Sequence, residues 1–283
     1  MLRPRTVARF VESFPARTPT LPPATHTNGY ALGGREVLLV EPATPYDDER
    51  AAWLAWAEGL RGGGRSLVAL FLTHHHIDHV GGARFLAREL GLPIWAHDET
   101  ASRVDFPIDR RLAEGDAITL DGPAAQRWVV HHTPGHAPGH LCLVEAESRV
   151  AVVGDMVASE GTILIAPGEG DMGEYLRQLE RMQTWKANVA LPAHGEPIDD
   201  PNALFARYVM HRLGRERIVA SAVRDAGAAG ATAADLVATA YADTSPALWP
   251  IAILSLRAHL EKLVKDGTVR EDDDERFSLR EAS

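Results

Sequence analysis

The sequence contains a single cysteine, Cys142, so no disulfide can form within the chain. This residue lies in the apolar run 141–144, which is typical of a core strand. Long apolar runs are also missing, and none approaches the roughly 20 residues that a transmembrane helix needs. Residues 1–15 contain arginines but lack the apolar segment of about 7 to 15 residues that a secretory signal requires. We therefore expect a cytoplasmic protein without a membrane partner.

Positive charge is scarce, with 29 Lys and Arg residues against 39 Asp and Glu residues and a net charge of −10. This balance offers no general attraction to polyphosphates. Residues 271–275 are all acidic, where a reader of duplex DNA needs basic side chains against phosphate, so we expect no duplex DNA partner. A local cluster of arginines is typical either of an anion-binding rim or of a solvated helix face with salt bridges. Its members are Arg207, Arg212, Arg215 and Arg217.

Histidine, in contrast, is concentrated in one stretch, residues 73–82, which follows the apolar run 67–72. In an extended segment residues i and i+2 point to the same side, so His74 and His76 can converge on one cation. The intervening His75 then points away, and we expect that its replacement has little effect. The pattern predicts a buried strand that delivers metal ligands to the edge of a sheet.

The remainder of this stretch and three later segments extend the predicted site. Asp78 and His79 follow where the chain turns into a helix at two glycines, and the turn can direct them toward a second position nearby. An accidental His-rich tract is the alternative, but three later segments also place a potential ligand directly after an apolar run. These ligands are His136, Asp155 and His194. Imidazole and carboxylate suit zinc, with manganese or iron as further possibilities.

Together these residues resemble the metallo-β-lactamase superfamily, whose signature His-x-His-x-Asp-His stands here as His74, His76, Asp78 and His79. The resemblance implies an α/β protein with the αβ/βα four-layer sandwich of that superfamily. It also implies one or two metal ions: the first held by His74, His76 and His136, the second by Asp78, His79 and His194, with Asp155 bridging. Asp155 stands where many true lactamases have a cysteine, so a secreted lactamase is disfavoured.

The pattern of short strands and helices agrees with two packed sheets covered by helices. Residues 1–23 contain five prolines and are expected to be mostly irregular, apart from a short stretch near residues 7–14. Strands are predicted at 25–32, 35–41, 94–96, 117–120, 126–132, 140–145, 149–153 and 188–191, and helices at 47–59, at 82–90 and from 171 onward. We expect His97 to be a satisfied loop histidine, and His132 and His140 to brace the loop around His136 by hydrogen bonds.

The last third of the chain has a different pattern. Helices are predicted at 201–226, from 232 and from 245 to 265, followed by short strands at 267–270 and 276–279, the outline of a winged helix. Residues 208–218 resemble the linker helix of the β-lactamase-like protein 2 group, which joins a metallo-β-lactamase domain to a small C-terminal winged-helix domain. We therefore expect a catalytic domain at 1–200 and a winged-helix domain at 201–283.

A metal ion held by imidazoles lowers the pKa of bound water toward ~7 and produces a hydroxide nucleophile. We therefore predict a metallo-hydrolase in which Asp78 helps to orient or deprotonate that water, acting on a small or carrier-bound ester or thioester. The β-lactamase-like protein 2 group includes single-strand-directed endoribonucleases, and related chains are thioesterases on carrier-bound polyketides. A nuclease of single-stranded RNA is thus the first alternative. An iron-dependent sulfur dioxygenase and a weak lactamase or lactonase are further ones, while the ligand set argues against a metal-free binding module.

Overall fold

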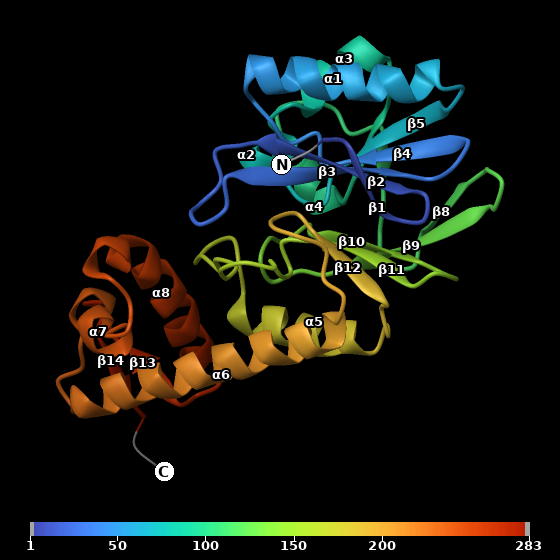
Figure 1. The fold of residues 1–283 in the computed structure, drawn as a ribbon. Helices are drawn as coiled ribbons and strands as arrows, with labels where there is room; N and C mark the ends of the chain where they lie inside the picture. Colours follow the sequence, from blue (N-terminus) through green and yellow to red (C-terminus); the bar gives the residue numbers. More distant parts are fainter. Residues whose placement is uncertain (1–2, 281–283) are drawn as a thin grey trace.

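The computed structural model describes residues 3–280 and contains two sheets packed face to face, with helices on their outer faces (Figure 1). The first sheet has seven strands in chain order. They are β1 (Arg5–Ala8), β2 (Val11–Arg17), β3 (His26–Leu32), β4 (Glu36–Val40), β5 (Ser66–Phe71), β6 (Ile94–Ala96) and β7 (Arg110–Arg111). The helices of this half are α1 (Asp47–Gly62), α2 (Ile77–Val80), α3 (Ala83–Leu90) and α4 (Asp98–Ala101), and α1 and α3 cover the outer face.

The second sheet has five strands in the order β12-β11-β10-β9-β8. They are β8 (Ala117–Leu120), β9 (Gln126–His132), β10 (Leu141–Glu145), β11 (Val150–Gly154) and β12 (Val189–Pro192). Strands β11 and β12 run parallel because α5 (Met172–Gln183) crosses over between them, and α5 and α6 (Pro201–Asp225) cover the outer face. The predicted four-layer sandwich is thus confirmed.

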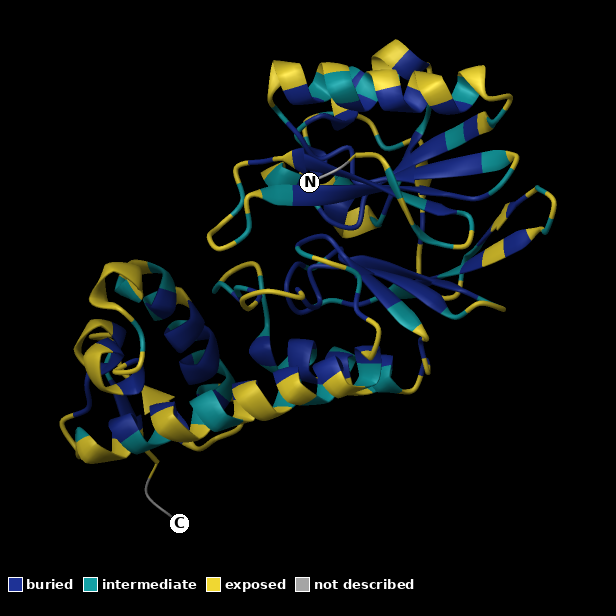
Figure 2. Cartoon of the chain, in the orientation of Figure 1, coloured by how far each residue is buried: buried dark blue, intermediate teal, exposed yellow. Residues whose placement is uncertain are grey.

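Burial follows from these layers. Strands β4, β5, β10 and β11 are almost continuously apolar because a sheet lies on one face and a helix on the other. Figure 2 shows that most of the two sheets is buried. Between the sheets lie large side chains such as Tyr30, Phe71 and Trp128. Trp53 fills the space between the first sheet and α1. These packed layers hold the ends of β5 and β11 in fixed positions.

The first 23 residues are more regular than expected, because β1 and β2 account for 11 of them and extend beyond the short stretch predicted near residues 7–14. Strand β2 pairs with β3 along its whole length, in spite of Pro15. The carbonyl of Pro15 accepts a hydrogen bond from Arg3, on the side that faces away from β3. Because the N and O of one residue point to the same side of a strand, the missing N–H of Pro15 removes no bond between β2 and β3.

The remaining predicted elements are present with shifts of at most four residues at their ends, and the strands predicted at 94–96, 117–120 and 126–132 match without a shift. The helix predicted at 82–90 is α3, which ends at Gly91 in the left-handed region (φ 63°). It is preceded by the short helix α2, which contains Asp78 and His79. The two-residue strand β7 was not predicted, because two arginines carry no strand pattern.

The C-terminal part forms the predicted winged helix. After α6 come α7 (Ala233–Ala240), a 3₁₀ turn (Pro246–Leu248), α8 (Trp249–Lys265), β13 (Val269–Glu271) and β14 (Phe277–Leu279), the last two antiparallel. Helix α6 belongs to two cores, since Phe205 packs against the second sheet and Val219 packs in the winged helix. The division at residues 200 and 201 stays a prediction. In the range 3–280 no helix is both long and apolar enough to span a bilayer.

Candidate metal centre

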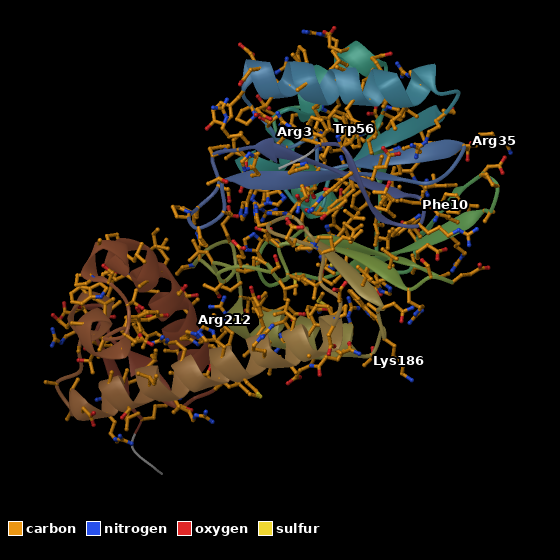
Figure 3. All side chains as sticks on the ribbon, in the orientation of Figure 1. Arg3, Phe10, Arg35, Trp56, Lys186 and Arg212 are labelled. Carbon is orange, nitrogen blue, oxygen red and sulfur yellow. The ribbon has the colours of Figure 1, made fainter. Side chains whose placement is uncertain are left out.

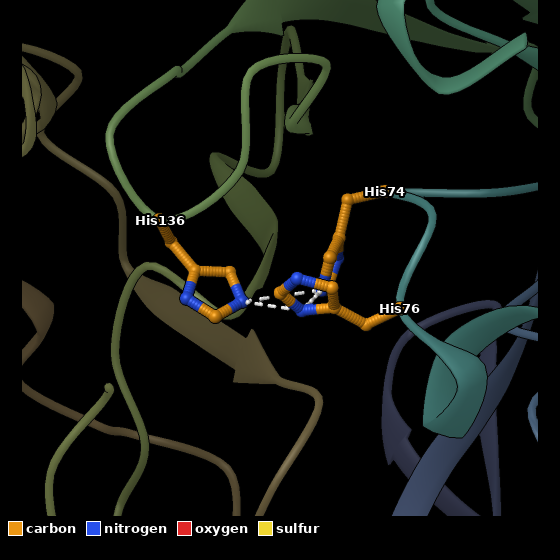
Figure 4. A group of neighbouring side chains, drawn as sticks. All are labelled: His74, His76 and His136. Atoms are coloured by element: carbon orange, nitrogen blue, oxygen red, sulfur yellow. Dashed lines mark hydrogen bonds between the residues drawn. The ribbon is translucent and has the colours of Figure 1, made fainter. Parts of the chain in front are cut away.

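The three histidines predicted for the first site meet at one point (Figure 4): His74 and His76 follow the end of β5, and His136 lies on the loop between β9 and β10. His76 Nδ1 lies 3.0 Å from both His74 Nε2 and His136 Nε2, and the last two atoms are 3.2 Å apart. Tetrahedral zinc with ligands at about 2.0 to 2.1 Å would hold two nitrogens about 3.3 Å apart. The three nitrogens therefore have a spacing that fits a single cation.

The residues predicted for the second site form an adjoining group. The Asp78 carboxylate lies 3.8 Å from His79 Nε2 and 3.6 Å from His194 Nε2. Asp155 lies between the groups, with one carboxylate oxygen 3.5 Å from both His79 Nε2 and His136 Nε2 and the other 3.4 Å from His194 Nε2. The structure therefore brings all seven predicted residues together.

Two atoms of this cluster indicate that it accommodates metal. His79 Nε2 and Asp155 Oδ1 are buried and have no hydrogen-bond partner among the described residues. An unpaired buried polar atom is costly, and both atoms are the donor types that divalent cations prefer. The donor set therefore fits one or two metal ions.

In each of the five histidines of the cluster, the ring nitrogen that faces away from the site bonds to a partner outside the cluster. Such contacts select the tautomer, so that the remaining nitrogen presents its lone pair to the site. The pairs are His74 with Thr73 Oγ1 (2.9 Å), His76 with Glu169 (3.1 Å), His79 with Glu41 (2.8 Å), His136 with the Leu164 carbonyl (2.8 Å) and His194 with the His26 carbonyl (2.9 Å).

Electrostatics prepare His74, His136 and Asp155 for a cation. Burial lowers the pKa of His136 to about 4 and, together with His79 and His76, holds the pKa of His74 well below its usual value. Burial opposes ionisation of Asp155, but His194 and His79 hold the pKa of its carboxyl well below the usual range. Neutral imidazoles and an ionised carboxylate are the forms that bind metal.

Three histidines that were not assigned to the site, His97, His132 and His140, have the predicted structural roles. His140 Nδ1 lies 2.7 Å from Thr133 Oγ1, and its Nε2 accepts the backbone N–H of Asp155. His132 donates to the carbonyl of Pro138 and so braces the loop. His97 caps α4 by accepting the N–H of Glu99. These three expectations are confirmed.

Sequence reasoning missed two carboxylates that contact the histidines. Glu41 is 1% exposed and accepts the N–H of Thr73 through one carboxylate oxygen. Its other carboxylate oxygen lies 2.8 Å from His79 Nδ1. It directly follows the apolar run of β4, so the strand-end rule that found Asp155 could have found it. Glu169 lies in the irregular segment between β11 and α5, where no periodic signal marks it.

A cleft of about 560 Å³ opens on the metal cluster and extends to the winged helix. His76, Asp78, His136, Asp155 and His194 form one end. The other walls come from residues 19–24, from residues 160–169, from α6 through Arg212 and from the winged helix through Leu248 and Ile251. The cleft therefore lies between the sandwich and the winged helix.

Comparison with known proteins agrees with the fold and the cluster. Residues 22–194 match the Metallo-beta-lactamase superfamily, which covers more than half of the chain. The chain belongs to this superfamily. Residues 232–277 match the Beta-lactamase associated winged helix domain. The protein is accordingly a metal-binding hydrolase of the metallo-beta-lactamase superfamily.

Individual relatives span most of the chain. A Beta-lactamase-like protein 2 homolog from Drosophila melanogaster is 29% identical over 256 residues, covering 86% of this chain and 84% of the relative. An atrochrysone carboxyl ACP thioesterase from Aspergillus novofumigatus is 30% identical over 261 residues, covering 86% and 75%. A solved beta-lactamase domain protein from Burkholderia ambifaria shares the fold at a TM-score of 0.84 and 22% identity, covering 98% of this chain and 93% of that chain. The predicted resemblance to the β-lactamase-like protein 2 group is confirmed.

Proposed function

We propose that this protein hydrolyses acyl esters or thioesters, with a small or carrier-bound acyl group, using zinc in one or two sites. The observation that carries the proposal is the cleft, whose metal end is continuous with apolar walls. Leu21, Pro22, Ile163, Leu248 and Ile251 line it. Burial of an acyl chain against such walls contributes about 0.8 kcal/mol per methylene. The name of the thioesterase relatives supports the same substrate class.

The arginines at the cleft favour an acyl substrate over RNA. Arg212 is buried, and its guanidinium donates to the Ile163 carbonyl and to Thr162 Oγ1. Arg215 pairs with Asp243 at 2.8 Å. Both guanidinium groups already have partners within the protein. They therefore offer little positive charge to the phosphates of single-stranded RNA, whose binding requires a positively charged groove.

In this proposal His74, His76 and His136 hold the first ion. Asp78, His79 and His194 hold the second, with Asp155 between the two groups. A divalent cation bound there activates water and stabilises negative charge on the attacked carbonyl group. Asp78 lines the cleft with a side chain that is 15% exposed, so its carboxylate can orient the attacking water and accept its proton. The apolar walls hold the acyl chain and exclude bulk water from the carbonyl carbon.

The test is a parallel assay of the zinc-loaded protein on aryl esters, acyl thioesters, a lactone, a lactam and a single-stranded RNA. We expect ester or thioester turnover to exceed lactam turnover, and Asp78→Asn to lower kcat by roughly 10²-fold or more. Asp98→Asn, an exposed carboxylate at the start of α4, is the control. Cleavage of RNA by the wild type but not by Asp78→Asn, with acyl substrates untouched, would replace this proposal with the nuclease.

Elemental analysis of protein purified without chelator identifies the metal. We expect zinc, up to two ions per chain. Iron as the predominant metal, together with oxidation of a sulfur substrate, would favour the dioxygenase alternative.

A further inference from the structure

Glu169 connects the wall of the cleft with the metal cluster. Its Oε2 lies 2.8 Å from His75 Nε2 and 3.1 Å from His76 Nε2. The same segment also reaches the first site through the Leu164 carbonyl, which accepts the Nδ1–H of His136. Two of the three histidines of the first group therefore have their outer nitrogen bonded to one irregular segment between β11 and α5.

The ring of His76 faces two ways. Its Nδ1 is the atom that meets His74 and His136 at 3.0 Å, and its Nε2 faces Glu169. A neutral imidazole carries one N–H, so Nδ1 presents a lone pair to an ion only when the proton is on Nε2. A carboxylate beside Nε2 stabilises that tautomer and orients the ring.

We propose that Glu169 is a positioning residue of the first metal site, which accepts the Nε2–H of His76 and thereby directs Nδ1 at the ion. The role rests on the proposed assignment of His74, His76 and His136 to that ion. Contacts of this kind typically change metal affinity by about 10- to 100-fold. No step of the reaction passes through Glu169 itself.

His75 gains a role from the same contact. Its Nε2 donates to the carboxylate oxygen that holds His76, so it fixes Glu169 from the opposite side. The strand geometry correctly turns His75 away from the three-histidine group, but the ring is a partner of Glu169. We therefore expect His75→Ala to weaken the first site, by less than Glu169→Ala does.

The location of Glu169 at the exposed cleft makes it suitable for substitution. The Glu169 side chain is 45% exposed at the cleft, so its removal leaves no buried cavity. Glu160 lines the same cleft and is also exposed, and in residues 3–280 no histidine is bonded to it. Glu160→Ala is thus the matched control for Glu169→Ala.

The experiment is a zinc titration of the full chain, freed of metal, against a chromophoric chelator. Wild type, Glu169→Ala, Glu169→Gln, His75→Ala and Glu160→Ala are compared. We expect Glu169→Ala to weaken the first site by about 10- to 100-fold, Glu169→Gln to weaken it less because the amide oxygen still accepts a hydrogen bond, and Glu160→Ala to match the wild type. Long-range ¹H–¹⁵N NMR of the metal-free protein should place the proton of the neutral His76 ring on Nε2 in the wild type. In Glu169→Ala it should show a mixture of the Nδ1–H and Nε2–H tautomers.

Three other outcomes would each contradict a different part of this proposal. Equal zinc affinity and an unchanged His76 tautomer in folded Glu169→Ala would remove the role of Glu169 and leave the metal centre intact. A third zinc ion in the wild type that is lost in Glu169→Ala would make Glu169 a ligand instead. A wild-type chain that binds no zinc would overturn both the metal centre and this inference.

Discussion

Asp155 is the residue at which the two groups of metal-site side chains meet. Its carboxylate lies within 3.5 Å of His79, His136 and His194. Its backbone N–H is donated to His140, which fixes the main chain at the end of β11. One oxygen has no hydrogen-bond partner in the described part of the chain. The negative charge of this one carboxylate therefore lies beside both predicted ion positions.

We predict that Asp155→Asn weakens metal binding at both positions and lowers kcat/KM by at least about 100-fold, because the amide keeps the shape but loses the charge. Metal analysis after dialysis against a weak chelator, together with steady-state kinetics, measures this. Glu145→Gln, a buried carboxylate at the end of β10, is the control. Retention of two ions at wild-type affinity would contradict a bridging role.

The predicted ligands could be found from the sequence because they follow apolar strands. Strands β9, β11 and β12 run in the same direction in the second sheet, and β5 of the first sheet delivers the other ligands to the same cluster. His74 and His76 needed only the two-residue repeat of an extended chain. Glu169 had no such signal, because its place depends on an irregular segment. The cleft could not be predicted either, since its walls come from three segments that meet only in the folded chain.

At the scale of elements, α6 connects the catalytic layers to the winged helix. Tyr208 near its middle bonds the carbonyl and the N–H of Ala158, which lies just after β11. One turn further on, Arg212 lies where α6 leaves the second sheet (Figure 3) and bonds the Ile163 carbonyl. The helix therefore holds the segment that contains Leu164 and Glu169.

We predict that Arg212→Ala destabilises the protein by roughly 2 to 3 kcal/mol, because the Ile163 carbonyl loses its charged donor inside the protein. The exposed Arg207 on the same helix is the matched site, where replacement by alanine should cost less than about 0.5 kcal/mol. Urea unfolding followed by circular dichroism gives both values. Equal stability of the two variants would show that Arg212 is not structural.

An ion pair between α5 and α8 predicts a pH dependence. Asp171 caps α5 and lies 2.6 Å from Lys265 at the end of α8. Burial alone would raise the pKa of Asp171, but Lys265 and the N–H of Glu174 hold it below its usual value. A depressed carboxyl pKa stabilises the fold above the unfolded value of about 3.9, and this stabilisation is lost as pH falls through the folded value.

We therefore expect Asp171→Asn, which keeps the helix cap, to cost less than about 1 kcal/mol at pH 7, since the pair is partly exposed. The difference from the wild type should shrink as the pH falls below roughly 4. Unfolding free energies at pH 7, 5, 4 and 3 measure it, and Lys265→Met should show the same loss at pH 7. A difference that grows toward acid would refute the assignment of the pair.

At the scale of the molecule, the cleft is lined by residues of both the sandwich and the winged helix. Deletion of residues 201–283 does not test the winged helix alone, because it also removes Leu204, Phe205 and Tyr208 from the core of the sandwich. At about 1.5 to 3 kcal/mol for each such side chain, that loss is comparable to the whole stability of a domain. The packing therefore predicts that the truncated chain does not fold, so single substitutions test the role of the winged helix more directly.

Leu248 offers such a substitution, because it projects from the 3₁₀ turn of the winged helix into the cleft and is 48% exposed. We predict that Leu248→Ser raises KM for a long acyl thioester by about 3- to 10-fold, since it removes part of an apolar contact worth up to about 1.4 kcal/mol. Turnover of a short acyl thioester and the metal content should stay unchanged, because the residue lies on the winged-helix wall. Leu254→Ser on α8 is the matched control: this leucine is 38% exposed and lies outside the cleft. If both variants leave KM for the long acyl substrate unchanged while the wild type prefers long chains, the acyl group binds elsewhere and the winged helix has no part in its recognition.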